Sequence, residues 1–496
     1  MSHLYEQLRP RLYKLAAINT TLELYHWDME TIAPEKAEEQ TGRLVGILSN
    51  EFYDTLLHPE TERLLTELEK PEAKDKLSIE EKAVLRQLRI NYDRIKCIPA
   101  KEYVEYHEMT LRSSVAWAKA RKNNDFASFA PMLKKVIEYK KKFAIYQKKE
   151  EENSYDVLLA DYEPCLTTKD LDEFFDYLKK ELVPLIKKVA KEHEKINDDF
   201  IFQDFDIEKQ KEFCHFILEY IGFDFSKGVV GESAHPFTIN LHNKDVRVTN
   251  HFSEQGFIGS IFSAIHEGGH GIYELGVSDK LTLTLAGTGA SMAMHESQSR
   301  FYENNIGRSK EFWEPIYDKL VTAFPKQLGD VTLDKFITGI NKVKPGLIRI
   351  DADELTYPLH IIIRYELEKM IFNDEITVEE LPEAWNKKCE EYLGIRPETD
   401  SEGVLQDTHW SCGDFGYFPS YAVGSAIAAE IYYHLLAKEQ LKNKLKNGNL
   451  KAVTEVLRKE IHQYGMIYDI NELLLRMTNE KFNPKYYVRY LKEKFE

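Results

Sequence analysis

The chain has 496 residues, of which 43% are hydrophobic and 30% charged, so it can bury a large core. Its formal net charge of −17 argues against a protein that binds nucleic acids, because phosphate binding needs a basic surface. It also argues against binding to an anionic membrane. Length alone suggests three domains, but no repeat, low-complexity tract or Pro/Gly-rich linker marks a boundary, and we expect one large body.

The first thirty residues have the spacing of an amphipathic helix and lack the basic segment, apolar run and cleavage site of a signal peptide. No stretch approaches the roughly 18 uninterrupted apolar residues that a membrane span needs. The five cysteines are scattered and form no CxxC pair, which predicts free thiols in a reducing compartment. We therefore expect a cytoplasmic protein in which any metal is held by histidines and carboxylates.

Apolar residues recur every three or four positions along most of the chain, which predicts helices. Segments with this spacing are residues 4–48, 80–123, 129–152, 171–195 and 426–477. Residues 235–252 instead alternate polar and apolar side chains on both sides of HNKD, which predicts a β-hairpin. The pattern indicates a mainly α protein with one small sheet.

The stretch SAIHEGGHGIYE directly follows that hairpin and carries two histidines four positions apart. Ser253 is the expected N-cap of a helix that runs from Glu254 to about Leu275. His266 and His270 then project from one face, one turn apart, and can reach the same tetrahedral zinc ion. Glu267 follows the first histidine, where its carboxylate can reach a water on the metal without being a ligand.

A chance occurrence of HExxH is the alternative, and the surrounding residues argue against it. The helix is apolar nearly all round and should be buried, and two buried imidazoles beside a glutamate are costly unless something satisfies them. Gly268 and Gly269 together cost the helix about 2 kcal/mol relative to alanine. Glycines at this place are expected where a second backbone approaches closely.

The stretch MAMHESQSR (residues 292–300) offers the third ligand on a second apolar helix packed on the first. Glu296 is the predicted ligand, and two histidines plus one glutamate leave a fourth position open, as in catalytic rather than structural zinc sites. The alternative pairs Glu296 with Arg300, one turn later. His295 faces about 100° away from Glu296 and is expected to support a ligand or pack rather than bind metal.

Three further segments carry more polar residues than a helical core tolerates without a purpose. They are LIRIDADELTY (347–357), GVLQDTHW (403–410) and GDFGYFPSYAVG (413–424). The hairpin adds HPF (235–237) and DVRVT (245–249).

Taken together, HPF, DVRVT, HEGGH, HESQ, IRIDAD and GVLQDTHW resemble the marks of the carboxypeptidase Taq family of metallocarboxypeptidases, in the family's order. These motifs span residues 235 to about 425. YHWDMETIAP (25–34) and YDVLLADYEP (155–164) also resemble family segments, so the likeness extends over the whole chain. The one departure is Cys165, where a glycine is expected, and no catalytic role falls on it.

The resemblance implies a mainly α fold related to neurolysin and angiotensin-converting enzyme, with a deep groove and a small sheet beside the HExxH helix. It implies a single catalytic domain over residues 1–496, two-lobed around one groove. It also implies release of single amino acids from the free C-terminus of peptides, one Zn²⁺ per chain with Co²⁺ in some members, and usually a homodimer.

Catalytic roles follow from the chemistry that such a reaction needs. Glu267 is expected to take the proton of the attacking water and pass it to the leaving amine. The developing oxyanion needs a donor besides the metal, and by analogy with related gluzincins Tyr421 is the first choice and His409 the second. Tyr417 competes with Tyr421 for this role.

An exopeptidase must also recognise a free carboxylate, which favours a buried bidentate cation. Arg349 and Arg247 are the candidates, and the strand that carries Arg247 could also pair with the substrate backbone along its edge. The alternative is that each arginine merely pairs with an aspartate close to it in sequence, Asp351 or Asp353 for the first and Asp245 for the second. His235 is expected to line the same subsite.

Two other functions fit parts of this pattern. A zinc oligopeptidase or dipeptidyl carboxypeptidase could use the same residues, and an amidated peptide would separate these activities. A non-catalytic peptide-binding scaffold is the other alternative, and the intact Glu267 argues against it because loss of the base is the simplest route to an inactive enzyme.

Overall fold

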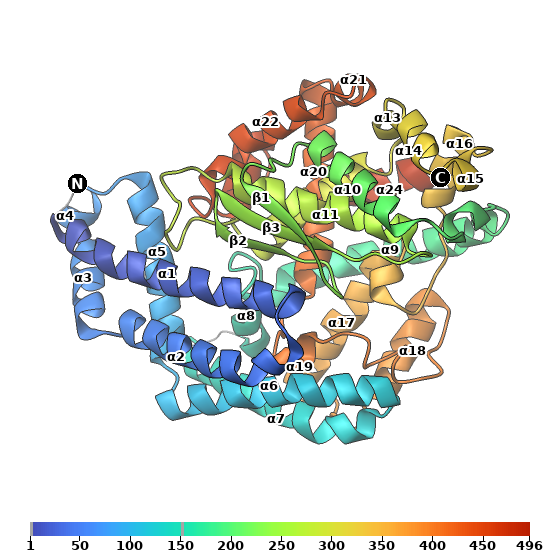
Figure 1. Cartoon of the computed structure of the whole chain (residues 1–496). Helices are drawn as coiled ribbons and strands as arrows, with labels where there is room; N and C mark the ends of the chain where they lie inside the picture. The colour runs from blue at the N-terminus through green and yellow to red at the C-terminus, as the bar shows by residue number, and fades with distance from the viewer. Residues whose placement is uncertain (1–2, 150–152) are drawn as a thin grey trace. The chain divides into compact units, whose positions relative to one another are not determined.

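The computed structural model describes residues 3–149 and 153–496 (Figure 1). These residues divide into two compact units. Unit 1 comprises residues 1–96, 197–340 and 428–482, and unit 2 comprises residues 97–196, 341–427 and 483–496. The helix α20 (Pro419–Lys438) contributes its first half to unit 2 and its second half to unit 1.

Unit 1 contains the HExxH helix and, within the described residues, all of the β-structure. Its elements besides α20 are α1 (His3–Thr31), η1 (Glu35–Ala37), α2 (Glu38–Leu56), α3 (Pro59–Glu69), α4 (Pro71–Lys74), α5 (Ile79–Lys96), η2 (Asp199–Phe202), α10 (Ile207–Ile221), β1 (Gly228–Glu232), β2 (Thr238–His242), β3 (Asp245–Asn250), α11 (Phe257–Gly276), α12 (Met292–Arg300), the π-helical η3 (Phe301–Ile306), α13 (Lys310–Trp313), α14 (Tyr317–Ala323), α15 (Pro325–Leu328), α16 (Leu333–Ile340), α21 (Leu441–Lys446), α22 (Leu450–Glu460), η5 (His462–Tyr464) and α23 (Ile470–Thr478).

The regular secondary structure described in unit 2 consists of helices. Its elements besides α20 are α6 (Ala100–Asn123), α7 (Phe126–Gln147), α8 (Ser154–Leu159), α9 (Thr168–His193), η4 (Arg349–Asp351), α17 (Tyr357–Phe372), α18 (Leu381–Leu393), α19 (His409–Cys412) and α24 (Lys485–Phe495). The prediction of a mainly α protein with one small sheet beside the HExxH helix is confirmed.

The sheet has three strands in the order β1-β3-β2. β2 and β3 form the predicted antiparallel hairpin, and β1 pairs in parallel with the other side of β3. β1 was not predicted, because Val229 and Val230 are both exposed and the strand lacks the alternation of a half-buried strand. β3 is therefore the central strand, and the expectation that it offers a free edge to substrate is wrong.

One face of this sheet packs on α11. Val246 and Val248 of β3 are buried, and a methyl group added at Gly271 of α11 would lie 3.2 Å from Cγ1 of Val248. On its other sides α11 contacts α10 and α12. These contacts make α11 the centre of its unit, as its apolar sequence predicts.

The two glycines between the histidines mark the predicted close contacts. A Cβ at Gly269 would lie 2.8 Å from Cα of Ser299 and 2.9 Å from the carbonyl oxygen of Gln298, both in α12. A Cβ at Gly268 would lie 2.7 Å from side-chain carbons of α10. The absence of side chains here lets the backbone of α12 approach the histidine face of α11.

Ser253 does not cap α11, and the helix begins three residues later than predicted, after Gly256. The carbonyl of Ser253 accepts from the side chain of Gln210, and that of Glu254 accepts from the backbone N–H of Phe205. These two carbonyls accept from α10 and from the residue Phe205 ahead of it, and residues 254–255 form a turn.

The long predicted helices are interrupted at prolines and at residues with positive φ. Pro34 separates α1 from α2 and Pro99 separates α5 from α6, because the residue before a proline disfavours the α conformation. The 426–477 segment is divided into α20 to α23, with Gln440 and Gly448 left-handed at the first two breaks. The last three residues of the predicted 129–152 helix lie outside the described residues.

Of the helices described, none combines the length and the apolar composition needed to cross a bilayer. The prediction that unit 1 and unit 2 together form one catalytic domain stays a prediction.

Candidate metal centre

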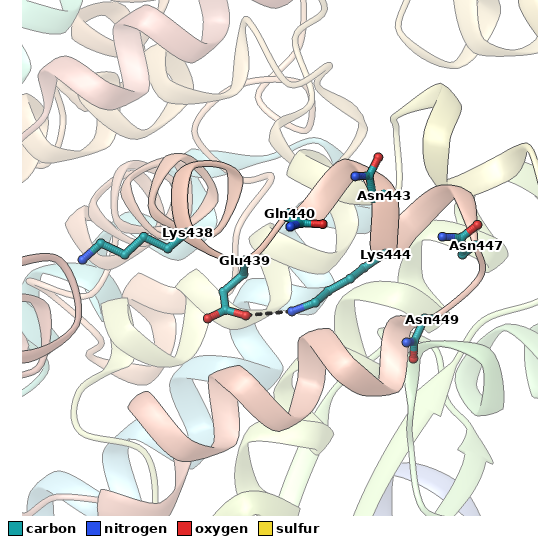
Figure 2. A pocket seen from close by; sticks show the side chains of 7 residues that line it. All are labelled: Lys438, Glu439, Gln440, Asn443, Lys444, Asn447 and Asn449. Atoms are coloured by element: carbon teal, nitrogen blue, oxygen red, sulfur yellow. Dashed lines mark hydrogen bonds and ion pairs between the residues drawn. The ribbon is translucent and has the colours of Figure 1, made fainter.

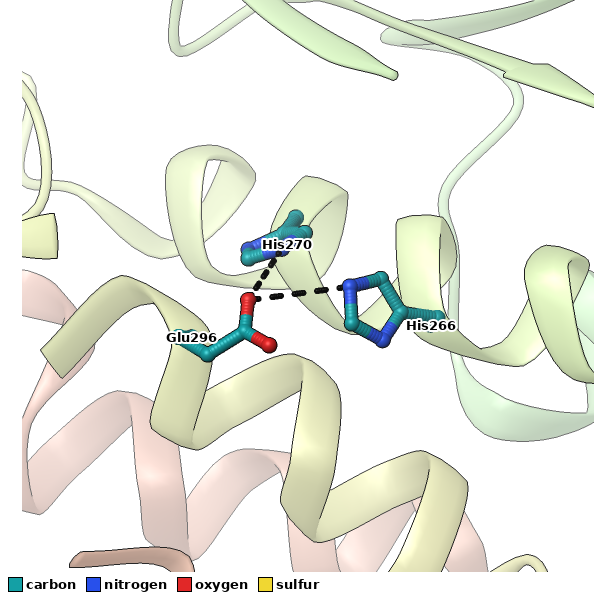
Figure 3. A group of neighbouring side chains, drawn as sticks. All are labelled: His266, His270 and Glu296. Carbon is teal, nitrogen blue, oxygen red and sulfur yellow. Dashed lines mark ion pairs between the residues drawn. The ribbon is translucent and has the colours of Figure 1, made fainter. Parts of the chain in front are cut away.

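The histidine face of α11 lies against α12, and the structure brings the three predicted ligands together there. Nε2 of His266 is 3.7 Å and Nε2 of His270 is 3.4 Å from the same oxygen of Glu296, Oε2 (Figure 3). The ligand atoms of all three residues lie within 4.8 Å of one another. No other group of metal-binding side chains in the described ranges meets the same criterion.

These separations fit a tetrahedral metal ion. Ligands at about 2.0–2.1 Å from zinc subtend edges of roughly 3.3 Å, close to the observed 3.4 and 3.7 Å. The donor set of two imidazole nitrogens and one carboxylate oxygen also suits zinc and similar divalent ions. The residues present therefore fit the metal that the sequence predicts.

Glu296 serves two partners with its two oxygens. Oε2 faces the histidines, whereas Oε1 accepts from Nε of Arg300 at 2.6 Å, so the ion pair with Arg300 is present and does not occupy the oxygen that faces the histidines. Burial alone would raise the pKa of Glu296, but Arg300 and the two histidines outweigh it and hold this pKa below its ordinary value. The carboxylate is therefore ionised and can bind a cation.

The Nδ1 atoms of the two histidines are held by different partners. Nδ1 of His266 lies 2.8 Å from Oε2 of Glu303, in the π-helical turn after α12. Nδ1 of His270 lies 2.5 Å from Nδ1 of His295, whose Nε2 lies 2.7 Å from Oε1 of Glu274. Each of these hydrogen-bonded series ends in a carboxylate, which can only accept when ionised. This favours the hydrogen of both His266 and His270 on Nδ1, and that tautomer would leave the Nε2 lone pairs for a metal ion.

Burial favours this neutral state at His270. Its pKa is lowered to about 3 by burial, with His295 and His266 adding to the effect. For His266, burial also lowers the pKa, but Glu296 and Glu303 outweigh it and raise this pKa above its ordinary value. The surroundings of His270 thus favour its neutral form, whereas those of His266 shift its equilibrium toward the protonated form.

The His295–Glu274 pair is expected to strengthen metal binding through His270. Glu274→Gln and His295→Ala should each weaken zinc binding by about 10–100-fold. His295→Ala removes the partner that fixes the ring and tautomer of His270, and Glu274→Gln removes the carboxylate that orients His295. Competition with a chromogenic chelator measures this affinity. Both residues act on His270, so the double variant should bind zinc no more weakly than whichever single variant has the lower zinc affinity. Parental affinity in both single variants would contradict the arrangement.

Glu267 is buried beside the ligands and held from the sheet. Its Oε2 accepts from Oγ1 of Thr238, the first residue of β2, at 2.6 Å. Burial raises the pKa of Glu267, with His266 and the Thr238 hydrogen bond acting in the opposite direction. A raised pKa makes the carboxylate a stronger base than an exposed glutamate.

The other two predicted residues of unit 1 do not contact this cluster. Arg247 in β3 forms a bidentate pair with Asp245, with two N–O distances of 2.9 Å, and lies over the ring of Trp27. This is the aspartate pairing that the sequence left as an alternative. His235 is exposed ahead of β2, and its carbonyl accepts from Ser233.

In unit 2, Arg349 and the GVLQDTHW stretch form a buried charged cluster. Nε and Nη2 of Arg349 each lie 2.9 Å from Oδ1 of Asp407, so its partner is neither Asp351 nor Asp353. Oδ2 of the same aspartate accepts from Nε of Arg364 at 2.6 Å. One carboxylate thus lies between two guanidinium groups, which leaves this trio with a net positive charge.

His409 and Tyr421 lie at the edge of this cluster and contact each other. Nε2 of His409 is 3.1 Å from the hydroxyl oxygen of Tyr421, and the guanidinium of Arg349 lies 5.1 Å from the Tyr421 ring. Burial and the nearby arginines lower the pKa of His409 to about 3, although Asp407 acts in the opposite direction. Tyr417 contacts both rings edge-on or tilted.

The sequence predicted a supporting or packing role for His295, which contacts His270, but it missed Glu274, Glu303 and Thr238, which hold other residues of the site. Glu274 follows His270 by one turn on the same face of α11 and is an acidic residue in an apolar helix, so this signal was present. Glu303 and Thr238 gave no such signal. Their roles depend on the π-helical turn and on the place of β2 beside α11.

A separate surface pocket in unit 1, with a volume of about 340 Å³, is lined by the end of α20 and by α21 (Figure 2). Its lining residues are Lys438, Glu439, Gln440, Asn443, Lys444, Asn447 and Asn449. Glu439 and Lys444 pair across it at 2.8 Å, and none of the predicted site residues lies there.

Two imidazoles and a carboxylate around one point, with a buried glutamate beside the first histidine, define the site of a metallopeptidase. The chain belongs to the carboxypeptidase Taq (M32) metallopeptidase family, whose model matches residues 7–495. It is thus a metallocarboxypeptidase, an enzyme that hydrolyses peptides and depends on a divalent metal. The predicted family and enzyme class are confirmed.

Relatives match nearly the whole chain. Carboxypeptidase 1 of Bacillus subtilis is 41% identical over 495 residues, covering 99% of this chain and 98% of that protein. Thermostable carboxypeptidase 1 of Pyrococcus furiosus is 35% identical over 493 residues, with the same coverage. The crystal structure of an M32 carboxypeptidase from Deinococcus radiodurans superposes with a TM-score of 0.95 at 30% identity, over 99% of this chain and 98% of that one.

Proposed function

We propose that the chain releases single amino acids from the free C-terminus of peptides, with one zinc ion per chain held by His266, His270 and Glu296. The observation that carries this proposal is the pair of Nε2 atoms facing one carboxylate oxygen at 3.4 and 3.7 Å. When bound, the metal supplies a Lewis acid that polarises the peptide carbonyl and lowers the pKa of water. Cobalt satisfies the same donor set.

Glu267 is proposed as the general base. It accepts a proton from the attacking water and then gives it to the leaving amine, which needs a carboxylate that is ionised yet more basic than usual. Burial supplies the basicity, and the Thr238 hydrogen bond fixes one oxygen so that the other is directed to the water.

Tyr421 is proposed as the donor to the oxyanion, with His409 setting the direction of its hydroxyl hydrogen. Nδ1 of His409 is buried without a hydrogen-bond partner among the described residues, which favours the tautomer with its hydrogen on Nε2. Nε2–H then donates to the Tyr421 oxygen, and the Tyr421 hydroxyl donates in turn to another oxygen. Tyr417, whose ring contacts both His409 and Tyr421, is the competing candidate for the same role.

Arg349 is proposed as the residue that recognises the C-terminal carboxylate. The trio of Arg349, Arg364 and Asp407 keeps one positive charge in a buried setting, which a carboxylate neutralises. Arg247 is the weaker candidate, because Asp245 already neutralises it. The place of His235 in this subsite stays a prediction.

The test of this specificity compares a free-acid peptide with its C-terminal amide, with products identified by mass. A carboxypeptidase releases one residue from the acid and spares the amide. An oligopeptidase cuts both, and a dipeptidyl carboxypeptidase releases a dipeptide first. Cleavage of the amide at the rate of the acid would contradict the proposal.

Arg349→Ala should narrow the ratio of acid to amide cleavage by about 30-fold or more. An amide leaves the net positive charge of the buried trio without a counter-charge, which costs roughly 2–5 kcal/mol, and this penalty against the amide disappears with the arginine. Arg247→Ala is the matched control and should leave the ratio within twofold of the parent. An unchanged ratio in Arg349→Ala, with parental metal content, would remove Arg349 from this role.

We also propose that the protein acts in the cytoplasm as a homodimer, as the family resemblance implies. The absence of any paired cysteine is consistent with a reducing compartment. Light scattering at micromolar concentration measures the mass, and a value near the 57.9 kDa of one chain would contradict the dimer.

A further inference from the structure

A buried carboxylate in unit 2 has no place in the mechanism above. Glu368 lies near the end of α17, is inaccessible to solvent and accepts three hydrogen bonds. Its Oε1 accepts from Nε1 of Trp410 at 2.7 Å. Its Oε2 accepts from the backbone N–H of Gly416 at 2.8 Å and from the hydroxyl of Tyr155 at 2.6 Å.

Two of these donors lie in the segment between His409 and Tyr421. Trp410 directly follows His409, and Gly416 lies five residues before Tyr421. Glu368 therefore binds both α19, which begins at His409, and the turn before α20, which carries Tyr421. Residues 409–421 are called the loop below. The third donor, Tyr155, comes from α8, outside this loop.

The loop has little room to adjust at these points. Gly416 has a φ of +87°, and a Cβ there would lie 2.8 Å from the backbone of Leu158. The Trp410 side chain is buried and contacts the rings of Trp385 and Phe418. A change at the carboxylate is consequently transmitted to the positions of Trp410 and Gly416.

No cation among the described residues pairs with Glu368. Arg364, one turn earlier on α17, is bound to Asp407 and Gln406, and Lys369 is bound to Asp172. Burial raises the pKa of Glu368 to about 7, although its three donors favour the ionised form. An unpaired carboxyl in the core is costly, so its hydrogen bonds must serve a purpose that an apolar residue cannot.

Only a carboxyl group can accept from two separate N–H donors on its two oxygens. Glutamine has one oxygen, so in either orientation its amide group would point at the N–H of Trp410 or at the N–H of Gly416. Glutamate avoids this conflict in both protonation states, since a protonated Oε2 can donate to Tyr155 and still accept from Gly416.

We propose that Glu368 is a positioning residue that holds the His409–Tyr421 pair in place by bonding Trp410 and Gly416 at once. This inference rests on the proposed function of Tyr421 as the oxyanion donor. A donor to the oxyanion acts mainly in the transition state, so a displaced Tyr421 lowers kcat and leaves KM nearly unchanged.

Glu368→Gln should lower kcat by about tenfold or more, with KM within twofold of the parent and an unchanged metal content. Glu366→Gln is the matched control on the same helix, because Glu366 pairs with Lys179 and Lys388 away from the loop. It should leave kcat within twofold. Parental kcat in Glu368→Gln, or a rise in KM alone, would overturn the proposal.

The route of the effect is tested in a Tyr421→Phe background. If Glu368 acts through this pair, Glu368→Gln should cost less than twofold once the Tyr421 hydroxyl is gone. A full and independent loss in the double variant would overturn the proposal, as would parental kcat in Tyr421→Phe alone. The parent protein is assayed beside the variants. A parent that releases no single residues contradicts the proposed function, whereas an active parent with an unaffected Glu368→Gln contradicts only this inference.

A second pair of variants decides the matter if Glu368→Gln does not fold. Trp410→Phe removes the loop donor and should lower kcat, whereas Tyr155→Phe removes the donor from α8 and should leave kcat within twofold. Equal losses of kcat in these two variants would show that the carboxylate stabilises unit 2 without positioning the loop, and would overturn the proposal.

Discussion

Glu267→Gln should bind zinc as tightly as the parent and hydrolyse peptides about 10³- to 10⁴-fold more slowly. The amide has the shape of the carboxylate and can still accept from Oγ1 of Thr238 through its oxygen, so the fold and the three ligands are unaffected. It cannot accept a proton from water at any pH of the assay. The loss should therefore fall on kcat, with little change in KM.

The measurement is single-residue release by the zinc-loaded variant, with zinc per chain determined on the same sample. Glu254→Gln is the matched control, because that glutamate is exposed ahead of α11 and should retain the parental rate. Turnover by zinc-loaded Glu267→Gln within tenfold of the parent would mean that another group removes the proton.

Glu296→Ala should lower zinc affinity by more than about 100-fold, a larger loss than that expected for His295→Ala. The substitution removes one of the three proposed ligand atoms and takes the carboxylate of Glu296 away from Arg300, which keeps its ion pair with Glu303. Positive charge then lies close to two histidines whose Nε2 atoms need to bind a cation. Both effects weaken the site.

Chelator competition and zinc stoichiometry after gel filtration measure this loss. Glu296→Gln separates the two effects, because the amide oxygen can still accept from Arg300 while the charged ligand is gone. One tightly bound zinc per chain in Glu296→Ala would contradict the ligand set and move the third ligand to His295 or Glu303.

The sequence predicted the local parts of the site well. Helical spacing placed His266 and His270 on one face, and alternation placed β2 beside β3 in a hairpin. The burial of α11 was predicted from its apolar residues, and the close approach at Gly269 was predicted from the glycine itself. These features depend on residues near one another in the chain, where periodicity carries the information.

Features that depend on distant segments were missed or misplaced. The start of α11 moved because carbonyls of residues 253 and 254 bond to residues 205 and 210. Arg349 pairs with Asp407, 58 residues later in the chain, and not with an aspartate close to it in sequence. Glu368 gave no signal, since its donors come from three separate elements of the sequence. No periodic pattern encodes such contacts.

The most direct test of metal-dependent exopeptidase activity is to return zinc to the metal-free protein and to identify the products that it releases. The protein is freed of metal by chelation, its metal content is verified, and a free-acid peptide is digested at increasing zinc while products are identified by mass. The account predicts no cleavage without metal, and single C-terminal residues in amounts that rise with zinc and level off at one equivalent per chain. Undiminished cleavage by the verified metal-free chain, or dipeptides and internal fragments as first products, would contradict it.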